Sequence, residues 1–433
     1  MYHILLCRRR LLTLTALLSL GTFSCKKEME QSTLTTNVRS YTVSEAQART
    51  AAENIALSPG VVTQRLHNEQ THDTQPIFQG RQRIADFAAL PAADGQPGLY
   101  LCNYVQGGFA IISADRHMDP VLAFAKQGSL PFNRLHDRDA TPGGLAAWLE
   151  TTLLITNALR QNPSGNAPRP GAMATWNTLV GNMQPATEVS ANEPVKETDT
   201  MPSNSGRLAP PPSPPPCYSV QRGPFMQTTW GQNCGYNDYV TSSGLQAYCY
   251  HCPTGCVATA QAQVMYYWKA PASFNWSAMS PSSGTSATAH LMDDLGGKLR
   301  MNYTPTASGA DPDYIDDALK GNYGYGSAEY ISNQSGMVQA IQDNLRVDMP
   351  VILSGAPSVN WFGYQNASGH CWVTDGYIQS ECDGSSYLAF YMNWGWDGQY
   401  NGWFNPYNWQ VTWSDGSVHN YNCAQTYTYN IHP

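Results

Sequence analysis

Charged side chains are scarce in this chain of 433 residues: they make up 13% of it, about half the share of an ordinary soluble domain. The formal net charge is −8, and no long run of Lys and Arg follows the N-terminus. Nucleic acid is therefore not an expected partner, because binding phosphates requires clustered basic residues. Long apolar runs are also lacking, since beyond residue 20 none approaches the ~18 residues that a membrane-spanning helix needs.

The first 25 residues predict an export signal. Arg8–Arg10 precede the apolar run Leu11–Leu20, which is too short to span a bilayer. Cys25 then follows Gly-Thr-Phe-Ser, an arrangement that resembles the lipobox of bacterial lipoproteins, although Phe23 is larger than the residue usual there. We expect a lipid on Cys25 to anchor the chain at the outer membrane or cell surface, with residues 26–40 as a polar tether. Secretion without use of Cys25 is the alternative.

The length suits two domains. The first, residues 41–160, contains no cluster of His, Cys or carboxylates that would carry chemistry. Its strands flank Gln106-Gly107-Gly108, which is typical of a hairpin turn. The expected elements are a helix within 43–57, strands at 99–105, 109–113 and 121–125, and a helix at 145–159.

A proline-rich segment follows the first domain. Residues 161–216 hold 12 of the 29 prolines, so we expect an extended linker that is open to proteases. The composition then changes to one rich in Tyr, Trp, Gly and Asn. Residues 217–433 are therefore expected to form the second domain.

A cysteine in the second domain stands where a helix is expected to begin. In TGCVATAQAQVMYYW at 254–268 the helix should start after Pro253, with Thr254 as its cap and Cys256 in its first turn. Exposed N–H groups at a helix start favour the thiolate, which is the nucleophilic form of cysteine. A buried structural cysteine, or one in a disulfide, is the alternative. One face of the helix is apolar: Val257, Ala260, Val264 and Trp268.

A thiolate nucleophile needs a base, and His370 is the best placed candidate. It stands between Gly369 and an apolar, strand-like run, and the order of Cys before His is that of papain-like proteases. A hydrogen-bonded core histidine is the alternative. His251 is nearer to Cys256 in sequence but lies in a Cys-rich loop. An amide such as that of Asn393 can orient the imidazole, and Trp394 can shield the pair from water. The alternative is that these residues form an ordinary aromatic turn.

Gln232 in TTWGQ at 228–232 completes the candidate site. Its amide, beside a backbone N–H, would stabilise the charge that forms on a carbonyl oxygen under attack. Eight cysteines lie from residue 217 onward, so one catalytic thiol leaves an odd number. His251, Cys249 and Cys252 lack the spacing of a closed four-ligand zinc site, and we expect neither metal nor cofactor.

Four blocks of the second domain together resemble the streptopain family of papain-like cysteine peptidases. They are TTWGQ at 228–232, TGCVATAQAQVMYYW at 254–268, GHCWVTDGY at 369–377 and NWGWDGQYNGWF at 393–404. The resemblance implies that Cys256 is the nucleophile, that His370 is the general base and that Gln232 belongs to the oxyanion hole. It implies supporting roles beside the histidine for Asn393 and Trp394.

The first domain is similar to the propeptide of that family. The similarity lies in GGFAIISAD at 107–115 and PVLA at 120–123. It implies an inhibitory domain that is removed by a cut, which we expect between residues 195 and 222. The chain departs from the family pattern where Cys371 replaces the usual small residue after the histidine. Cys249 and Cys252 are further additions, which either brace the cleft as disulfides or form an inhibitory bond that reduction releases.

The expected fold is therefore α+β, a papain-like protease domain behind an α+β propeptide domain. The expected function is that of a cysteine endopeptidase made as a zymogen, with peptides or proteins as substrates and its own propeptide as intramolecular inhibitor. A catalytically silent surface lipoprotein that acts in binding or inhibition is one alternative. Another acyl-transfer enzyme on the same scaffold, such as a transglutaminase-like protein, is the second.

Overall fold

The computed structural model describes residues 41–55, 61–66, 69–73, 81–135, 141–161, 168, 171–181, 218–332, 336–356, 369–382, 385–406, 410–412, 418–420 and 423–433. The expected signal, the lipid site at Cys25 and the tether lie outside these residues. Residues 42–433 form one compact unit. Within the described parts no helix combines the length and the apolar character that crossing a bilayer demands.

The N-terminal domain, residues 42–181, is an antiparallel meander with helices packed on it. Helix α1 starts with a capping box, in which Ser44 and Gln47 bond each other's backbone N–H. The predicted hairpin is confirmed by the pairing of Cys102 with Ala110. The elements are α1 (Glu45–Glu53), β3 (Ile84–Pro91), β4 (Pro97–Tyr104), β5 (Phe109–Ser113), β6 (Val121–Ala125), α2 (Gly143–Gln161) and α3 (Ala172–Val180).

Helix α3 corrects the prediction of an extended linker from residue 161. Trp176 in this helix is 1% exposed, and its indole Nε1 donates to the Met118 carbonyl at 3.0 Å. Asn54 Nδ2 donates to the Leu179 carbonyl at 2.8 Å. The sequence ATWNTLV therefore belongs to the core of the N-terminal domain, and a count of prolines alone places the boundary too early. The rest of the expected linker, residues 182–216, lies outside the described residues.

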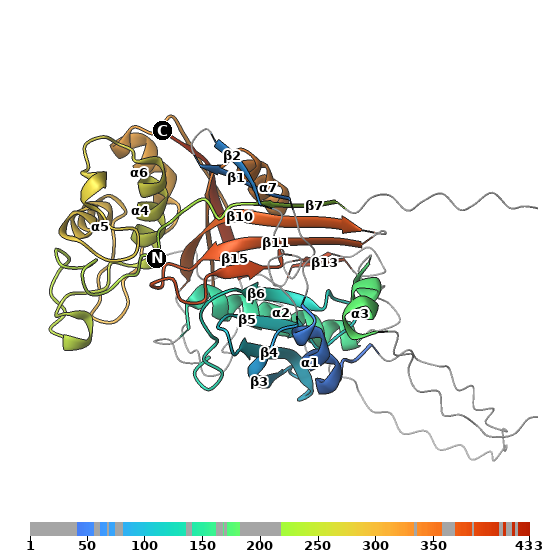
Figure 1. The fold of residues 1–433 in the computed structure, drawn as a ribbon. Coiled ribbons are helices and arrows are strands. Elements are labelled where there is room, and N and C mark those ends of the chain that lie inside the picture. Colours follow the sequence, from blue (N-terminus) through green and yellow to red (C-terminus); the bar gives the residue numbers. More distant parts are fainter. Residues whose placement is uncertain are drawn as a thin grey trace, which may run out of the picture. The chain divides into compact units, whose positions relative to one another are not determined.

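The C-terminal domain combines a group of helices with a strongly bent sheet (Figure 1). The predicted α4 and the predicted strand at His370 are both present. Its helices are η1 (Gln246–Tyr248), α4 (Cys256–Trp268), η2 (Trp276–Ala278), α5 (Ser286–Lys298), α6 (Tyr314–Tyr323) and α7 (Met337–Arg346). Its strands are β7 (Tyr218–Arg222), β8 (Ser327–Ile331), β9 (Val351–Ala356), β10 (His370–Cys382), β11 (Ser385–Asn393), β12 (Gly402–Phe404), β13 (Gln410–Thr412), β14 (Val418–Asn420) and β15 (Cys423–His432).

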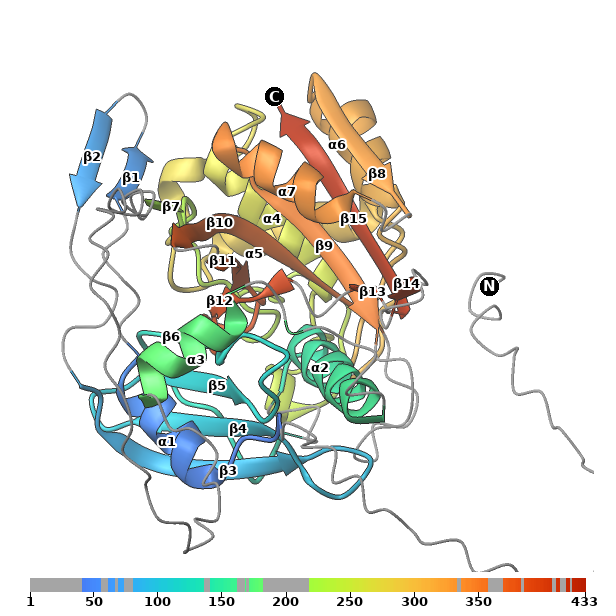
Figure 2. The ribbon, with the colours of Figure 1, turned by 90° about the vertical axis from the view of Figure 1, so that its right-hand side faces the viewer.

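The two domains share one sheet, a feature that the sequence did not indicate. Strand β12 pairs with β6, so that Trp403 lies opposite Phe124 and Phe404 opposite Ala123. At the other edge of the C-terminal sheet, β7 pairs in parallel with β1 (Val61–Leu66), which forms a hairpin with β2 (Glu69–Asp73). Strands β3–β6 continue the sheet beyond β12, which Figure 2 labels next to β6.

Helix α2 packs against aromatic rings of the C-terminal domain. A Cβ placed on Gly144 would lie 2.7 Å from Trp394 and 2.9 Å from Trp372, so only glycine permits this approach. One turn on, Trp148 lies edge-on to Phe404, with ring centroids 5.2 Å apart. The start of α2 is thereby fixed beside residues of the expected active site.

Asp375 anchors the beginning of the C-terminal domain. It sits at a bulge in β10, is 1% exposed, and accepts bonds from the Met226 N–H at Oδ2 (2.6 Å) and the Phe225 N–H at its carbonyl (3.0 Å). Oδ1 has no partner within the described part of the chain. Burial raises the pKa of this carboxyl to about 7, against the opposing effect of the N–H donors.

We expect Asp375→Asn to remove a pH dependence of stability. Because the folded pKa is the higher one, the unfolded chain loses this proton first, and stability falls as the pH rises from about 4 to about 7. In a Cys256→Ala background, urea unfolding at pH 4.5 and 7.5 should show the Asn variant gaining at least about 1.4 kcal/mol on the parent at the higher pH. The exposed Asp86→Asn is the control, and an equal gap at both pH values for Asp375→Asn would contradict the prediction.

Candidate active site

Cys256 is the first residue of α4, as the sequence predicts, but the expected cap is wrong. Gly255 occupies the N-cap position with φ of 88°, while the Thr254 hydroxyl bonds that of Thr259 at 3.0 Å. A Cβ on Gly255 would lie 2.7 Å from Met301 Sδ. Glycine is thus required both by the backbone conformation and by the close approach of the loop that carries Met301.

The thiol of Cys256 is buried, and this reverses the expected effect of the helix start. Burial raises the pKa of Cys256, although N–H groups of Cys371, Cys256 and Val257 act to lower it. Loss of hydration outweighs these three dipoles, because burial disfavours the charged thiolate more than the neutral thiol. In this structure the neutral thiol is therefore the favoured form.

His370 is the first residue of β10 and is held by backbone and aromatic groups. Its Nε2 lies 2.8 Å from the carbonyl oxygen of Trp394, which can only accept, so Nε2 carries the proton. The ring stacks on Trp372 and meets Trp396 edge-on, at centroid distances of 6.1 and 6.0 Å. Burial lowers the pKa of His370 to about 4, so the imidazole is neutral at pH 7.

Asn393 does not make the predicted contact with the imidazole in this structure. Its Nδ2 donates to the Thr228 carbonyl at 2.7 Å and to Gln263 Oε1 at 3.1 Å, and its Oδ1 accepts from the Gly395 N–H at 3.2 Å. The contact with His370 belongs to the Trp394 carbonyl instead. Asn393 joins the TTWGQ segment, α4 and the turn after β11.

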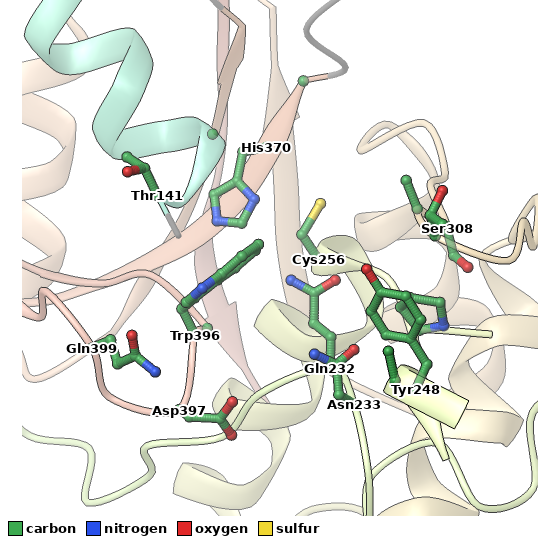
Figure 3. A pocket seen from close by; sticks show the side chains of 17 residues that line it. Thr141, Gln232, Asn233, Tyr248, Cys256, Ser308, His370, Trp396, Asp397 and Gln399 are labelled. Atoms are coloured by element: carbon green, nitrogen blue, oxygen red, sulfur yellow. The ribbon is translucent and has the colours of Figure 1, made fainter. Parts of the chain in front are cut away.

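Cys256, His370 and Gln232 line a single pocket of about 580 Å³. The side chain of Gln232 extends toward Cys256, and His370 and Trp396 lie beside them in the pocket (Figure 3). The described lining residues are Thr141, Gly143, Gln232, Asn233, Ala247, Tyr248, Pro253, Cys256, Thr306, Ala307, Ser308, Gly369, His370, Gly395, Trp396, Asp397 and Gln399. The segments that carry the four sequence blocks thus come together, as predicted.

Two lining residues, Thr141 and Gly143, come from the N-terminal domain. Sequence reasoning missed them because neither lies in a motif and their place depends on the docking of α2. It also missed Tyr248 and residues 306–308, which lie in loops without regular periodicity.

The cysteines near the site divide into a disulfide and free thiols. Cys234 and Cys249 are bonded to each other, so Cys249 forms a disulfide and does not bond the thiol of Cys256. Cys252 and Cys371 are free and buried. Burial, followed by the charge of Cys256, raises the pKa of Cys371 well above its usual range. His251 is tied to the Val240 carbonyl through Nδ1 at 2.5 Å.

Both domains match known protein families. Residues 230–404 match the Peptidase C10 family, and residues 40–152 match the Spi protease inhibitor family. Streptopain of Streptococcus pyogenes is 23% identical over 348 residues, covering 71% of this chain and 73% of that protein. The thiol protease/hemagglutinin PrtT of Porphyromonas gingivalis is 29% identical over 208 residues, covering 40% of this chain and 22% of that protein.

A solved structure shows the same fold. A fragment of prointerpain A from Prevotella intermedia matches with a TM-score of 0.52 at 20% identity, covering 80% of this chain and 99% of the fragment. The expected α+β architecture, a papain-like domain preceded by a propeptide-like domain, is confirmed by this match. With the fold and both family matches in agreement, the chain carries a Peptidase C10 (streptopain-like) domain and, ahead of it, a propeptide-like domain similar to the Spi protease inhibitor family.

Proposed function

We propose that this chain is the inactive precursor of an exported cysteine endopeptidase whose nucleophile is Cys256 and whose general base is His370. The observation that carries the proposal is their common pocket, which the amide of Gln232 also lines. A thiol at a helix start, an imidazole at a strand start and an amide donor are the groups that acyl transfer from a peptide requires.

In the active form His370 takes the proton of the Cys256 thiol. The thiolate attacks the peptide carbonyl carbon, and the Gln232 amide and the Cys256 N–H donate to the resulting oxyanion. His370 then gives its proton to the leaving amine as the C–N bond breaks and a thioester forms. Water, deprotonated by His370, hydrolyses the thioester and restores the thiol.

The N-terminal domain supports latency through burial and through the pocket itself. Thr141 and Gly143 line the pocket, and Thr141 lies near His370 (Figure 3). Burial keeps both Cys256 and His370 neutral, and the imidazole proton is directed at the Trp394 carbonyl. Removal of the domain, by a cut between residues 195 and 222, would admit water and free the imidazole to pair with the thiol.

Export is part of the same proposal. It rests on the basic and apolar residues ahead of Cys25, whose lipid would anchor the precursor, and on the disulfide between Cys234 and Cys249. Disulfides persist mainly in oxidising compartments outside the cytosol. The substrates would be proteins or peptides in that space.

Gln263 acts as a positioning residue in this proposal. It is fully buried in α4, and its Oε1 accepts from Asn393 Nδ2 at 3.1 Å and from the Trp230 N–H at 3.4 Å. One carbonyl oxygen therefore connects the nucleophile helix to the segment before Gln232 and to the turn that contacts His370. Its two partners belong to segments far apart in the sequence.

Self-processing tests the proposed nucleophile. Under reducing conditions we expect the full chain to shorten to a product that begins between residues 195 and 222 and hydrolyses peptides. Cys256→Ala should remain intact and inactive, since no thiolate forms. The buried thiol Cys252 provides the control, and Cys252→Ala should process normally. Equal processing and hydrolysis by Cys256→Ala and the parent, followed by gel electrophoresis and peptide assay, would refute the assignment.

Gln263→Leu should lower kcat at least about tenfold while leaving the fold intact, because the Trp230 and Asn393 donors lose their shared acceptor. Gln263→Glu keeps an acceptor and should recover much of the activity. Gln261→Leu alters a second buried glutamine of α4, which contacts Met265 instead, and should retain kcat. An equal loss in both Leu variants would indicate a general packing effect.

Gly144→Leu should produce a leaky precursor. The added side chain collides with the rings of Trp372 and Trp394 and displaces the start of α2 from the pocket. We expect the intact variant to be alkylated at Cys256 by iodoacetamide at least about tenfold faster than the parent, a free-energy difference of about 1.4 kcal/mol. Gln161→Leu, at the exposed end of the same helix, is the control and should be alkylated at the rate of the parent. The same parental rate for Gly144→Leu would contradict a part for α2 in latency.

A further inference from the structure

One end of the pocket is formed by the C-terminal domain alone. Tyr248 and Ser308 lie on either side of it, on the far side of Cys256 from His370 (Figure 3). Thr141, a described lining residue from the N-terminal domain, lies near His370 instead (Figure 3). We call the region around Tyr248 and Ser308 the Tyr248 end. Tyr248, Ser308 and the described lining residues next to them in the chain, Ala247, Thr306 and Ala307, are all uncharged.

The Tyr248 end is held by a covalent link. Cys249, the residue after Tyr248, is bonded to Cys234, which follows Gln232 and Asn233. The disulfide therefore ties the turn that presents Tyr248 to the segment that presents the oxyanion amide. Its loss would release both walls at once.

Hydrogen bonds fix the same turn from inside. The buried Asn237 donates through Nδ2 to the carbonyls of Tyr248 at 3.0 Å and Cys252 at 3.2 Å. Cys249 and Tyr250 have positive φ values of 51° and 66°, which side-chain-bearing residues adopt at a cost. A tight turn with two such residues keeps its shape only where surrounding contacts impose it.

The chemistry of the leaving group gives the pocket a direction. The imidazole that protonates the leaving amine must lie on the side of that amine, so the leaving half of the substrate runs toward His370 and Trp396. The acyl half then runs the other way, past Cys256 toward Tyr248. An uncharged lining favours an uncharged side chain there, because a buried charge without a partner is costly.

We propose that Tyr248 is a specificity-determining residue, whose ring, held in place by the disulfide Cys234–Cys249, limits the size of an uncharged side chain in the acyl half of the substrate. The inference rests on the proposed function and extends it to substrate choice. It assigns the disulfide a positioning role, because it fixes the distance between the Tyr248 wall and the oxyanion amide.

The test uses enzyme that the full chain has released by its own processing. Peptide amides are varied, one at a time, at the three positions before the cleaved bond, with Ala, Leu, Phe or Lys. Tyr248→Ala should raise the ratio of kcat/KM for Phe over Ala by at least about tenfold at one of these positions, since a removed ring opens space for a large side chain. Tyr248→Trp should lower the same ratio, and Lys should remain the poorest residue there.

Tyr250→Ala is the matched control, because Tyr250 lies in the same loop, is 55% exposed and does not line the pocket. Replacement of both Cys234 and Cys249 by Ser should raise KM and shift the Phe/Ala ratio in the direction of Tyr248→Ala. Unchanged ratios at all three positions in active Tyr248→Ala and Tyr248→Trp would overturn the proposal. An unmutated enzyme that hydrolyses none of the peptides would instead overturn the proposed function, and this proposal with it.

Discussion

The polar start of α4 inside an otherwise apolar core is the constraint on which the site depends. Thr259 and Gln263 are completely buried, and each bonds backbone or side-chain groups of segments that lie far from α4 in the sequence. A buried polar group is stable only when its partners are in place, so the helix specifies its neighbours more strictly than apolar packing would. The same strictness places the segment that carries Gln232 and the turn that contacts His370 around Cys256.

The latency proposed for this chain would combine geometry with electrostatics. Two residues of the N-terminal domain line the pocket, and burial shifts the pKa of the thiol upward and that of the imidazole downward to about 4. Each shift favours the neutral form, so transfer of the proton from Cys256 to His370 is opposed from both sides. Hydration of the same two groups would reverse both effects without any change in the residues.

Local features of the chain were predictable because they depend on neighbouring residues. The helix start at Cys256, the strand start at His370 and the hairpin around Gly107 follow from nearby composition, and the four motif blocks indicated the family. The N-cap was missed because Thr254 is a common capping residue, whereas the contact that selects Gly255 comes from Met301 far along the chain. Helix α3 was missed for a similar reason, since Trp176 is buried by residues of another segment.

Long-range pairing was beyond sequence reasoning for a physical reason. Strands β6 and β12 pair across about two thirds of the chain's length, and neither carries a pattern that identifies its partner. The contact of His370 with the Trp394 carbonyl was equally hidden, because any residue at 394 presents the same backbone oxygen. The side chain of Trp394 explains only why that oxygen is held still, through its bond to the Tyr400 carbonyl.

The shared sheet changes what maturation demands of the molecule. A domain that only blocks a pocket can leave once the linker behind it is cut. A domain whose strand lies in the middle of a shared sheet can leave only when the backbone hydrogen bonds of that strand break. If the proposed cut falls before β7, the β6–β12 and β1–β7 junctions would still join the two pieces of the chain. Separation of the pieces, rather than scission of the peptide, would then decide when the peptidase domain is free, and it would leave β12 and β7 as open edges for other strands to join.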